Sequence, residues 1–360
     1  MARIACVAKQ YNQADVCGTL ISNGAFQQWC YIFGHQADQV GFTGRGKRLK
    51  NWIYPGPGML KPFRQVDYYN VLNSYDAVYF STGGIRPSRE KVVFMEFKDL
   101  NVPFIVGVHD EDDYRAYEPN LQAMAGHPKF RGLVVNGMEA LSLPIKARKV
   151  HWFPCTLPAY LLKDSTTWQD RPGGLLYAGR LITWRFLRAL AQLTKSDAFM
   201  NEVQSQVEIR GVAPGIGGHV LEEKLKTMQP RWSRVEGYFN VYDIAQMQAM
   251  YGRRRFFWEV GRVDPGKRYY RRFNLVAVEA IGQGCIPIVS PEFAPDWTHE
   301  FSILFDHRNW TEQDIVSRLR AVNHNYDVHR ERMRDIVLKS HWSFENVKIQ
   351  FRKLLQALFV

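Results

Sequence analysis

Short apolar runs alternate with amphipathic segments along almost the whole chain. Runs such as Phe104–Val108 and Phe256–Glu259 have the length and composition of buried strands. Segments such as 88–100 and 275–283 instead carry apolar residues at helical spacing. Because two parallel strands need a crossover between them, this alternation predicts parallel sheets covered by helices.

The alternation predicts two doubly wound α/β domains. A polar stretch at 163–174 interrupts it, and a chain of 360 residues is long enough for two domains. We therefore expect domains at 1–165 and 166–340, followed by a helix at 341–360, with ligands at the carboxyl ends of the strands. Strands are expected at 3–8, 77–81, 104–108, 132–136, 150–153, 174–178, 207–210, 256–259 and 286–290, with a strand end at 235–238. Helices are expected at 24–33, 88–100, 185–194, 220–228, 241–251, 275–283, 312–323, 328–339 and 344–358.

The chain is basic, with 47 Lys and Arg against 35 Asp and Glu and a net charge of +12. Such a charge indicates a polyanionic partner: a nucleic acid, an anionic membrane or a phosphorylated substrate. No apolar run approaches the roughly 18 residues of a membrane span, and the apolar start at 4–7 is too short for a signal peptide. The 5 cysteines are widely spaced and form no Cys-x-x-Cys pair, which argues against a disulfide framework or a zinc site. We expect a cytoplasmic protein.

A glycine and two arginines follow the strand expected at 174–178. Gly179 allows a close approach to the backbone, and Arg180 and Arg185 stand five positions apart. Arginine can hold a phosphate through two parallel hydrogen bonds, so the segment suits a diphosphate. The alternative is a pair of solvated arginines at the start of a helix.

A short apolar helix opens near Asn274, carries Glu279 and ends at Gly284. The free amides at the start of such a helix can hold a diphosphate. A carboxylate in its second turn can accept hydrogen bonds from ribose hydroxyls. The alternative is a surface glutamate, but Glu279 lies among apolar residues, where an unpaired carboxylate is rare.

Together the two segments resemble the donor-binding half of GT-B glycosyltransferases. The similarity covers about residues 174–290. The matching positions are Gly179-Arg180-Leu181, Arg185, Phe273, Leu275, Glu279-Ala280, Gly284 and Pro287. The chain departs from the pattern at Arg271, where the family has Glu, and at Arg272 and Asn274, where it has Gly.

This resemblance implies two Rossmann-like domains that face a cleft, with the C-terminal helix packing back on the N-terminal domain. It also implies a nucleotide-sugar donor, for which we expect a UDP-sugar, and no obligatory metal. Arg180 and Arg185 would hold the diphosphate, Glu279 the ribose and the segment at 235–239 the base. The donor-site residues so implied are Gly179, Arg180, Arg185, Tyr238, Phe239, Arg271, Asn274, Leu275 and Glu279.

Four carboxylates at 110–113 follow the strand Phe104–Val108, after His109. A carboxylate at the end of a buried strand can take a proton from an acceptor hydroxyl as a general base. The resemblance favours Asp110, with His109 beside it, as the catalytic pair. The alternatives are a solvated acidic loop and a Mg²⁺ site.

Two stretches carry the whole excess of positive charge. The stretch 41–66 has six basic residues and no acidic one, and 252–272 has eight basic residues against two acidic ones. Glycines and aromatic residues between the charges in the first stretch are typical of contact with a nucleic acid. The candidate contacts are Arg45, Lys47, Arg48, Lys50, Arg253, Arg254, Arg255, Lys267 and Arg268. The alternative is an effect on solubility or on the donor phosphates.

The C-terminal region also resembles bacteriophage DNA glycosyltransferases. The similarity rests on a helix with Glu279-Ala280, a Pro-Ile-Val strand, Glu292-Phe293, the segment 302–305 and two charged helices. It implies sugar transfer from a UDP-sugar to a 5-hydroxymethylpyrimidine flipped out of double-stranded DNA, by a monomer in the cytoplasm of a bacterial host. Two alternatives stay open. One is a GT-B enzyme acting on an anionic envelope glycan or glycolipid, and the other is a non-catalytic DNA-binding protein on the same scaffold.

Overall fold

The chain divides into two compact units. Unit 1 comprises Met1–Ala159 and Glu345–Val360 together with 268–270, and unit 2 comprises Tyr160–Lys267 and Arg271–Phe344. Apart from 268–270, the assignment changes between units at 159–160 and 344–345, and the sequence pattern places boundaries after 165 and 340. The computed structural model describes residues 1–8, 18–42, 60–63, 68–80, 99–108, 121–122, 124–136, 150–154, 156–163, 171–180, 186–212, 220, 223–227, 231–234, 244–261, 275–292 and 299–360.

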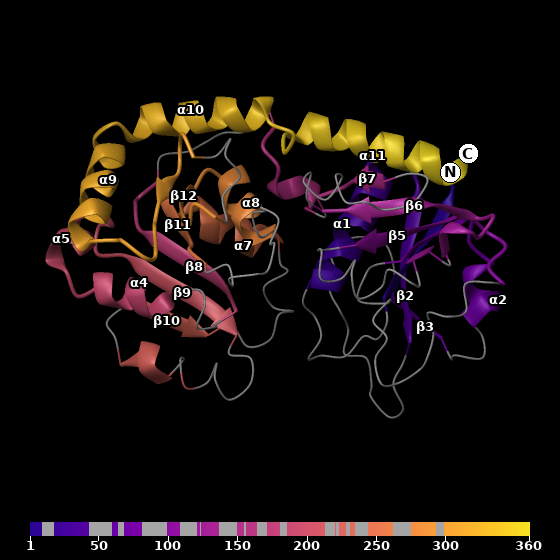
Figure 1. Cartoon of the computed structure of the whole chain (residues 1–360), viewed down its shortest axis with the longest axis horizontal. Helices are drawn as coiled ribbons and strands as arrows, with labels where there is room; N and C mark the ends of the chain where they lie inside the picture. The colour runs from indigo at the N-terminus through magenta and orange to yellow at the C-terminus, as the bar shows by residue number, and fades with distance from the viewer. Residues whose placement is uncertain are drawn as a thin grey trace. The chain divides into compact units, whose positions relative to one another are not determined.

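Unit 1 is built on a seven-stranded parallel sheet (Figure 1). Its strand order is β3-β2-β1-β4-β5-β6-β7, so the direction of the winding reverses between β1 and β4. The core strands form because their apolar runs are buried on both faces, as in β4 and β5. The strands are β1 (Arg3–Ala8), β2 (Gln36–Phe42), β3 (Leu60–Phe63), β4 (Ala77–Phe80), β5 (Phe104–Val108), β6 (Phe130–Val135) and β7 (Val150–Trp152).

Strands β2 and β3 are absent from the sequence-based prediction. In β2 the polar residues Asp38 and Gln39 break the apolar pattern, yet both are buried. The Tyr75 hydroxyl donates to Asp38 at 2.9 Å, and the Gln39 amide donates to Gln27 of helix α1 (Gly18–Ile32) at 3.2 Å. Because buried polar groups need such partners, the strand is stabilised by residues remote in the sequence.

The last helix of the chain, α11 (Phe344–Phe359), belongs almost entirely to unit 1. Its Phe351 ring is fully buried and lies 5.1 Å from the ring of Phe26 in α1 and 5.0 Å from that of Phe153. The same ring lies 6.0 Å from Trp29. The C-terminal segment thus completes the core of the unit in which the chain begins, and Figure 1 draws it in yellow.

Unit 2 contains a six-stranded parallel sheet in the order β10-β9-β8-β11-β12-β13. The winding reverses between β8 and β11. The strands are β8 (Leu175–Arg180), β9 (Val207–Val212), β10 (Arg231–Arg234), β11 (Phe256–Glu259), β12 (Ile286–Val289) and β13 (Ile303–Leu304). Two doubly wound parallel α/β sheets are therefore confirmed.

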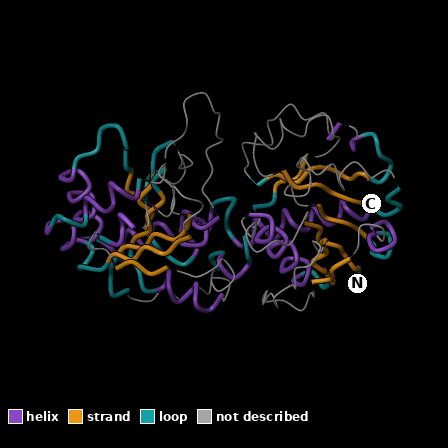
Figure 2. Tube along the Cα trace, turned by 90° about the horizontal axis from the view of Figure 1, so that it is seen from below, coloured by secondary structure: helices purple, strands orange, loops and turns teal. Residues whose placement is uncertain are grey.

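Helices flank the strands of unit 2, as Figure 2 shows in purple and orange. The crossover from β8 to β9 contains α4 and α5, and the crossover from β11 to β12 contains α8. These crossovers lead in opposite directions along the sheet, so right-handed connections place their helices on opposite faces. The helices are α4 (Leu187–Leu193), α5 (Asp197–Glu202), α7 (Ile244–Gly252), α8 (Leu275–Gly282), α9 (Glu312–His324) and α10 (Tyr326–Lys339).

Three expected elements cannot be placed in full. The helix at 88–100 and the strand end at 235–238 lie outside the described residues apart from 99–100, and the helix at 220–228 is described only in part. The structure also contains the short elements α2 (Tyr68–Leu72) and η4 (Pro158–Tyr160). None of the helices formed by the described residues is both long and apolar enough to cross a lipid bilayer.

Candidate functional site

The ends of β8 and β11 meet where the winding of the second sheet reverses. β8 ends at Arg180 and its parallel neighbour β11 ends at Glu259, so both carboxyl ends lie on one edge of the sheet. Doubly wound sheets bind their ligands at this position. The backbone of Gly179 has φ +155°, and a Cβ there would lie 3.2 Å from the Tyr177 hydroxyl, which explains why glycine precedes Arg180.

Two hydrogen bonds link the residues that follow the ends of β11 and β12. The Ser290 hydroxyl accepts a hydrogen bond from the Gly261 amide at 3.0 Å and donates one to the Gly261 carbonyl at 2.7 Å. Ser290 is fully buried. The two hydrogen bonds restrict the backbone where it leaves β11 and β12, at the edge of the sheet where a ligand would bind.

Glu259 places a carboxyl group at the same edge, although it is not among the candidate residues predicted from the sequence. Its side chain is 2% exposed at the carboxyl end of β11. The signal that selected Asp110, a carboxylate at the end of a buried strand, applies equally to Glu259. The same reasoning applied to every strand would therefore have found it.

Glu279 lies on α8 and is buried, with 7% of its surface exposed. The hydroxyl of Tyr251, at the end of α7, donates a hydrogen bond to Glu279 Oε2 at 3.2 Å. Burial raises the pKa of the Glu279 carboxyl group to about 8, because the charged form loses its hydration, while the hydrogen bond from Tyr251 acts in the opposite direction. Its burial agrees with the expectation that a glutamate among apolar residues does not lie on the surface.

Tyr251 is itself held on several sides and is fully buried. Its carbonyl accepts a hydrogen bond from Arg171 Nη1 at 2.6 Å. Its ring packs edge to face against Tyr160, at 6.2 Å between centroids, and against Phe257 of β11, at 6.0 Å. No pattern in the sequence points to Tyr251, because its partners come from four separate segments.

The three arginines at 253–255 precede the amino end of β11, and they therefore lie at the opposite edge of the sheet from Arg180. Arg254 forms an ion pair with Glu208 at 2.8 Å, and Arg255 lies over the Tyr326 ring at 4.5 Å. Only Arg253 of the three is largely exposed. These contacts favour a structural role for Arg254 and Arg255 over contact with a nucleic acid.

Several candidates lie outside the described residues: His109, Asp110, Arg185, Tyr238, Phe239, Arg271 and Asn274, together with Arg45, Lys47, Arg48, Lys50, Lys267 and Arg268. The backbones of Arg180 and Leu275 are described as the last residue of β8 and the first of α8, but their side chains are not. Within the part of the chain that the structure describes, no three His, Cys, Asp or Glu side chains gather as metal ligands.

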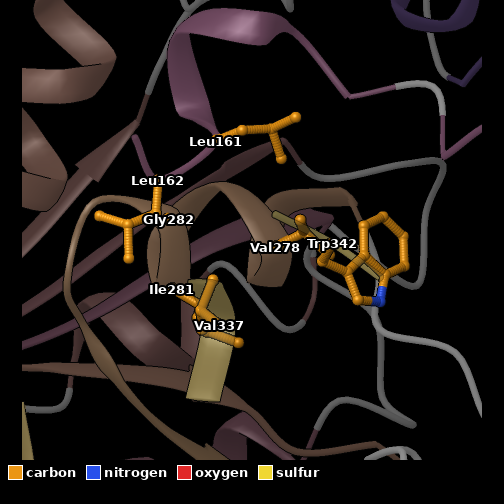
Figure 3. Close-up of a pocket in the computed structure, with 7 residues that line it drawn as sticks. All are labelled: Leu161, Leu162, Val278, Ile281, Gly282, Val337 and Trp342. Carbon is orange, nitrogen blue, oxygen red and sulfur yellow. The ribbon is translucent and has the colours of Figure 1, made fainter. Parts of the chain in front are cut away.

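A small pocket beside α8 is apolar and does not overlap the edge described above (Figure 3). The space inside it that the centre of a water molecule can reach is about 10 Å³, roughly enough for one water. A nucleotide does not fit there. Its lining consists of Leu161, Leu162, Val278, Ile281, Gly282, Val337 and Trp342, so the pocket marks where these segments pack against α8.

No family model matches this sequence, and no curated protein matches it. Solved structures do match, over the full chain. An alpha-glucosyltransferase in complex with UDP and a 13-mer DNA containing a central A:G mismatch has a TM-score of 0.68 and 14% identity, covering 100% of this chain and 99% of that one. An alpha-glucosyltransferase in complex with UDP and a 13-mer DNA containing an HMU base has a TM-score of 0.68 and 13% identity, covering 100% of both chains.

Two further structures have the same fold. TarM has a TM-score of 0.61 at 9% identity, covering 100% of this chain and 99% of its own. A structure described as trehalose-6-phosphate from E. coli bound with UDP-2-fluoro glucose has a TM-score of 0.57 at 10% identity, covering 99% of both chains. At these identities the likeness establishes the fold: the chain has the two Rossmann-like domains of the GT-B fold.

Proposed function

We propose that the protein is a glycosyltransferase that moves a sugar from a UDP-sugar to the hydroxyl group of a 5-hydroxymethylpyrimidine in DNA. The observation that carries this proposal is the full-length likeness to an alpha-glucosyltransferase solved with UDP and DNA that contains an HMU base. The position of Gly179 and Arg180 where the winding reverses supports the nucleotide-sugar donor independently.

In the donor half, Arg180 and Arg185 would hold the two phosphates and Glu279 the ribose. Arginine can bind each phosphate with two hydrogen bonds and stabilises the negative charge that grows on the departing diphosphate. The backbone amides at the start of α8 would also donate hydrogen bonds to the diphosphate. Tyr238 and Phe239 would enclose the uracil, with Arg271, Asn274 and Leu275 nearby.

In the acceptor half, Asp110 would act as the general base, with His109 beside it. The Asp110 carboxylate takes the proton of the hydroxymethyl group, while the oxygen of that group forms a bond to the anomeric carbon of the sugar. The bond from that carbon to the diphosphate breaks, and UDP leaves with the electron pair. The pyrimidine must first flip out of the DNA helix, because the enzyme cannot otherwise reach its hydroxyl group.

The DNA backbone would contact the basic stretch at 41–66, chiefly Arg45, Lys47, Arg48 and Lys50. This stretch combines positive charge with aromatic residues and has no acidic residue. Arg253, Lys267 and Arg268 remain secondary candidates. Arg254 and Arg255 are left out, because the contacts with Glu208 and Tyr326 already engage them.

The test is a transfer assay with radiolabelled UDP-sugar and three acceptors in parallel: hydroxymethylated duplex DNA, unmodified duplex DNA and an anionic envelope glycan. The proposal predicts label only in the hydroxymethylated duplex. Label in the envelope glycan would support the alternative of a glycosyltransferase that acts on envelope glycans, and would reject DNA as the acceptor. Absence of both transfer and donor hydrolysis, with intact DNA binding, would favour a non-catalytic DNA-binding protein.

A further inference from the structure

We propose that Tyr251 is a positioning residue, which holds the Glu279 carboxyl group in place for the ribose of the nucleotide sugar. This inference rests on the proposed function and adds to it a residue that no motif contains. Tyr251 would not touch the nucleotide. It would act through its hydrogen bond to Glu279.

The geometry divides the two carboxyl oxygens of Glu279 between two tasks. Oε2 accepts the hydrogen bond from the Tyr251 hydroxyl at 3.2 Å. Among the described residues, none forms a hydrogen bond with Oε1. A ribose hydroxyl can therefore bind to Oε1 without displacing the bond that orients the group.

Tyr251 is suited to this task because it cannot easily move. Its carbonyl is fixed by Arg171 at 2.6 Å, and the Cys285 thiol donates to the same oxygen at 3.4 Å. Its ring is fixed between Tyr160 and Phe257. A rigid partner restricts the rotamers of the glutamate before the donor arrives, so less conformational entropy is lost on binding.

The loss of this hydrogen bond should weaken donor binding more than it weakens the chemical step. Without the Tyr251 hydroxyl, Glu279 samples other rotamers and one of its oxygens stays buried without a partner. The KM for the UDP-sugar should rise, while kcat at a saturating donor concentration should stay close to that of the wild-type protein.

The experiment measures UDP binding by calorimetry for the full-length wild-type protein and for Tyr251→Phe, which keeps the ring and removes the hydroxyl. We expect about five- to tenfold weaker binding, the size of one lost hydrogen bond to a carboxyl group. The matched control is Tyr326→Phe. Tyr326 is a buried tyrosine of the same unit whose hydroxyl has no partner among the described residues, so UDP binding should be unchanged.

A double-mutant cycle separates positioning from general damage. If Tyr251 acts through Glu279, then Tyr251→Phe should cost little further UDP affinity once Glu279→Ala has removed the carboxyl group. Glu279→Asp gives a second variant, which withdraws the carboxyl group from Tyr251 by one methylene without altering the tyrosine. It should weaken UDP binding at least as much as Tyr251→Phe, because the shorter side chain also withdraws from the ribose.

Each outcome decides the matter. Wild-type affinity in Tyr251→Phe or in Glu279→Asp would overturn the positioning role, and so would strictly additive losses in the cycle. Absence of UDP binding by the wild-type protein would instead reject the donor assignment, and the role of Tyr251 with it. The wild-type measurement thus distinguishes the failure of the proposed function from the failure of this inference.

Discussion

The carbonyl oxygen of Tyr160 occupies the space that a side chain at Gly282 would need. A Cβ at Gly282 would overlap this oxygen, far inside the contact distance of the two atoms. Gly282 is the last residue of α8, and Tyr160 is the first residue of unit 2. The absence of a side chain at Gly282 therefore allows the chain to enter unit 2 directly against the helix that carries Glu279.

The first prediction is that Gly282→Ala destabilises the protein by about 2–4 kcal/mol, because backbone atoms must move to admit the methyl group. Gly252→Ala is the matched control, since Gly252 ends α7 and a Cβ there would meet nothing within 4 Å. Thermal unfolding should show a lower Tm for the first variant and a change within about 0.5 kcal/mol for the second. Equal Tm values for the two variants would contradict the close contact with Tyr160.

The second prediction concerns pH and the buried Glu279 carboxyl group. Burial raises its pKa to about 8 in the folded protein, against an ordinary value of about 4.5 when unfolded. Between these values the folded state binds the extra proton, so stability is lost as the pH rises. The Tm of the donor-free wild-type protein should fall relative to that of Glu279→Gln between about pH 5 and about pH 8, and level off above that range. A difference in Tm that does not change with pH would show that Glu279 is ionised in the fold.

Much of the fold can be predicted from the sequence, because strands such as Phe104–Val108 are apolar throughout and are buried on both faces. Strand β2 could not be predicted from its sequence pattern. Its buried Asp38 accepts a hydrogen bond from Tyr75, which lies 37 residues later in the sequence. Local patterns contain no information about such pairs.

The site divides in the same way. Glu279 lies on the helix expected for it, and Arg180, expected directly after a strand, is the last residue of that strand. Tyr251 follows no pattern, because its role depends on the packing of α7 against α8. For Arg254, the charge pattern suggested contact with a ligand but gave no sign of the ion pair with Glu208, which lies 46 residues earlier in the sequence.

The third prediction is that Asp110→Asn retains affinity for UDP and for DNA but loses sugar transfer. Asparagine has nearly the same shape as aspartate and cannot accept the proton, so turnover should fall by about 100-fold or more. Single-turnover assays with radiolabelled donor measure the chemical step directly. Asp113→Asn, from the same acidic segment, is the control and should transfer sugar normally.

Near-wild-type transfer by Asp110→Asn would remove Asp110 from the mechanism. Glu111 and Asp112 would then be the next candidates for the base. If their amide variants were also active, the reaction would follow a retaining course that uses no base from the protein.

The fourth prediction concerns the basic stretch at 41–66. Binding to duplex DNA should weaken steeply with salt, with a slope of log K against log salt near about −5 for five or six phosphate contacts. Reversing the charges of Arg45, Lys47 and Arg48 should reduce this slope by about 3 and leave UDP binding unchanged. Fluorescence anisotropy over a range of salt concentrations measures the slope.

The control for this variant reverses three exposed lysines elsewhere, Lys195, Lys224 and Lys353, and so reaches the same net charge. It should retain most of the slope if DNA binds at one surface. Equal losses in the two triple variants would mean that only the overall charge matters, and that no DNA surface exists at 41–66.

The most direct test of the account is the identity of the nucleosides in DNA after the reaction. Duplex DNA containing 5-hydroxymethylpyrimidine is incubated with the protein and UDP-glucose, digested to nucleosides and analysed by mass spectrometry. The account predicts a new nucleoside that is heavier by one hexose, formed by the wild-type protein and not by Asp110→Asn, while the unmodified nucleosides stay unchanged. Complete recovery of the hydroxymethyl nucleoside, from a preparation that binds both UDP and this DNA, would contradict it.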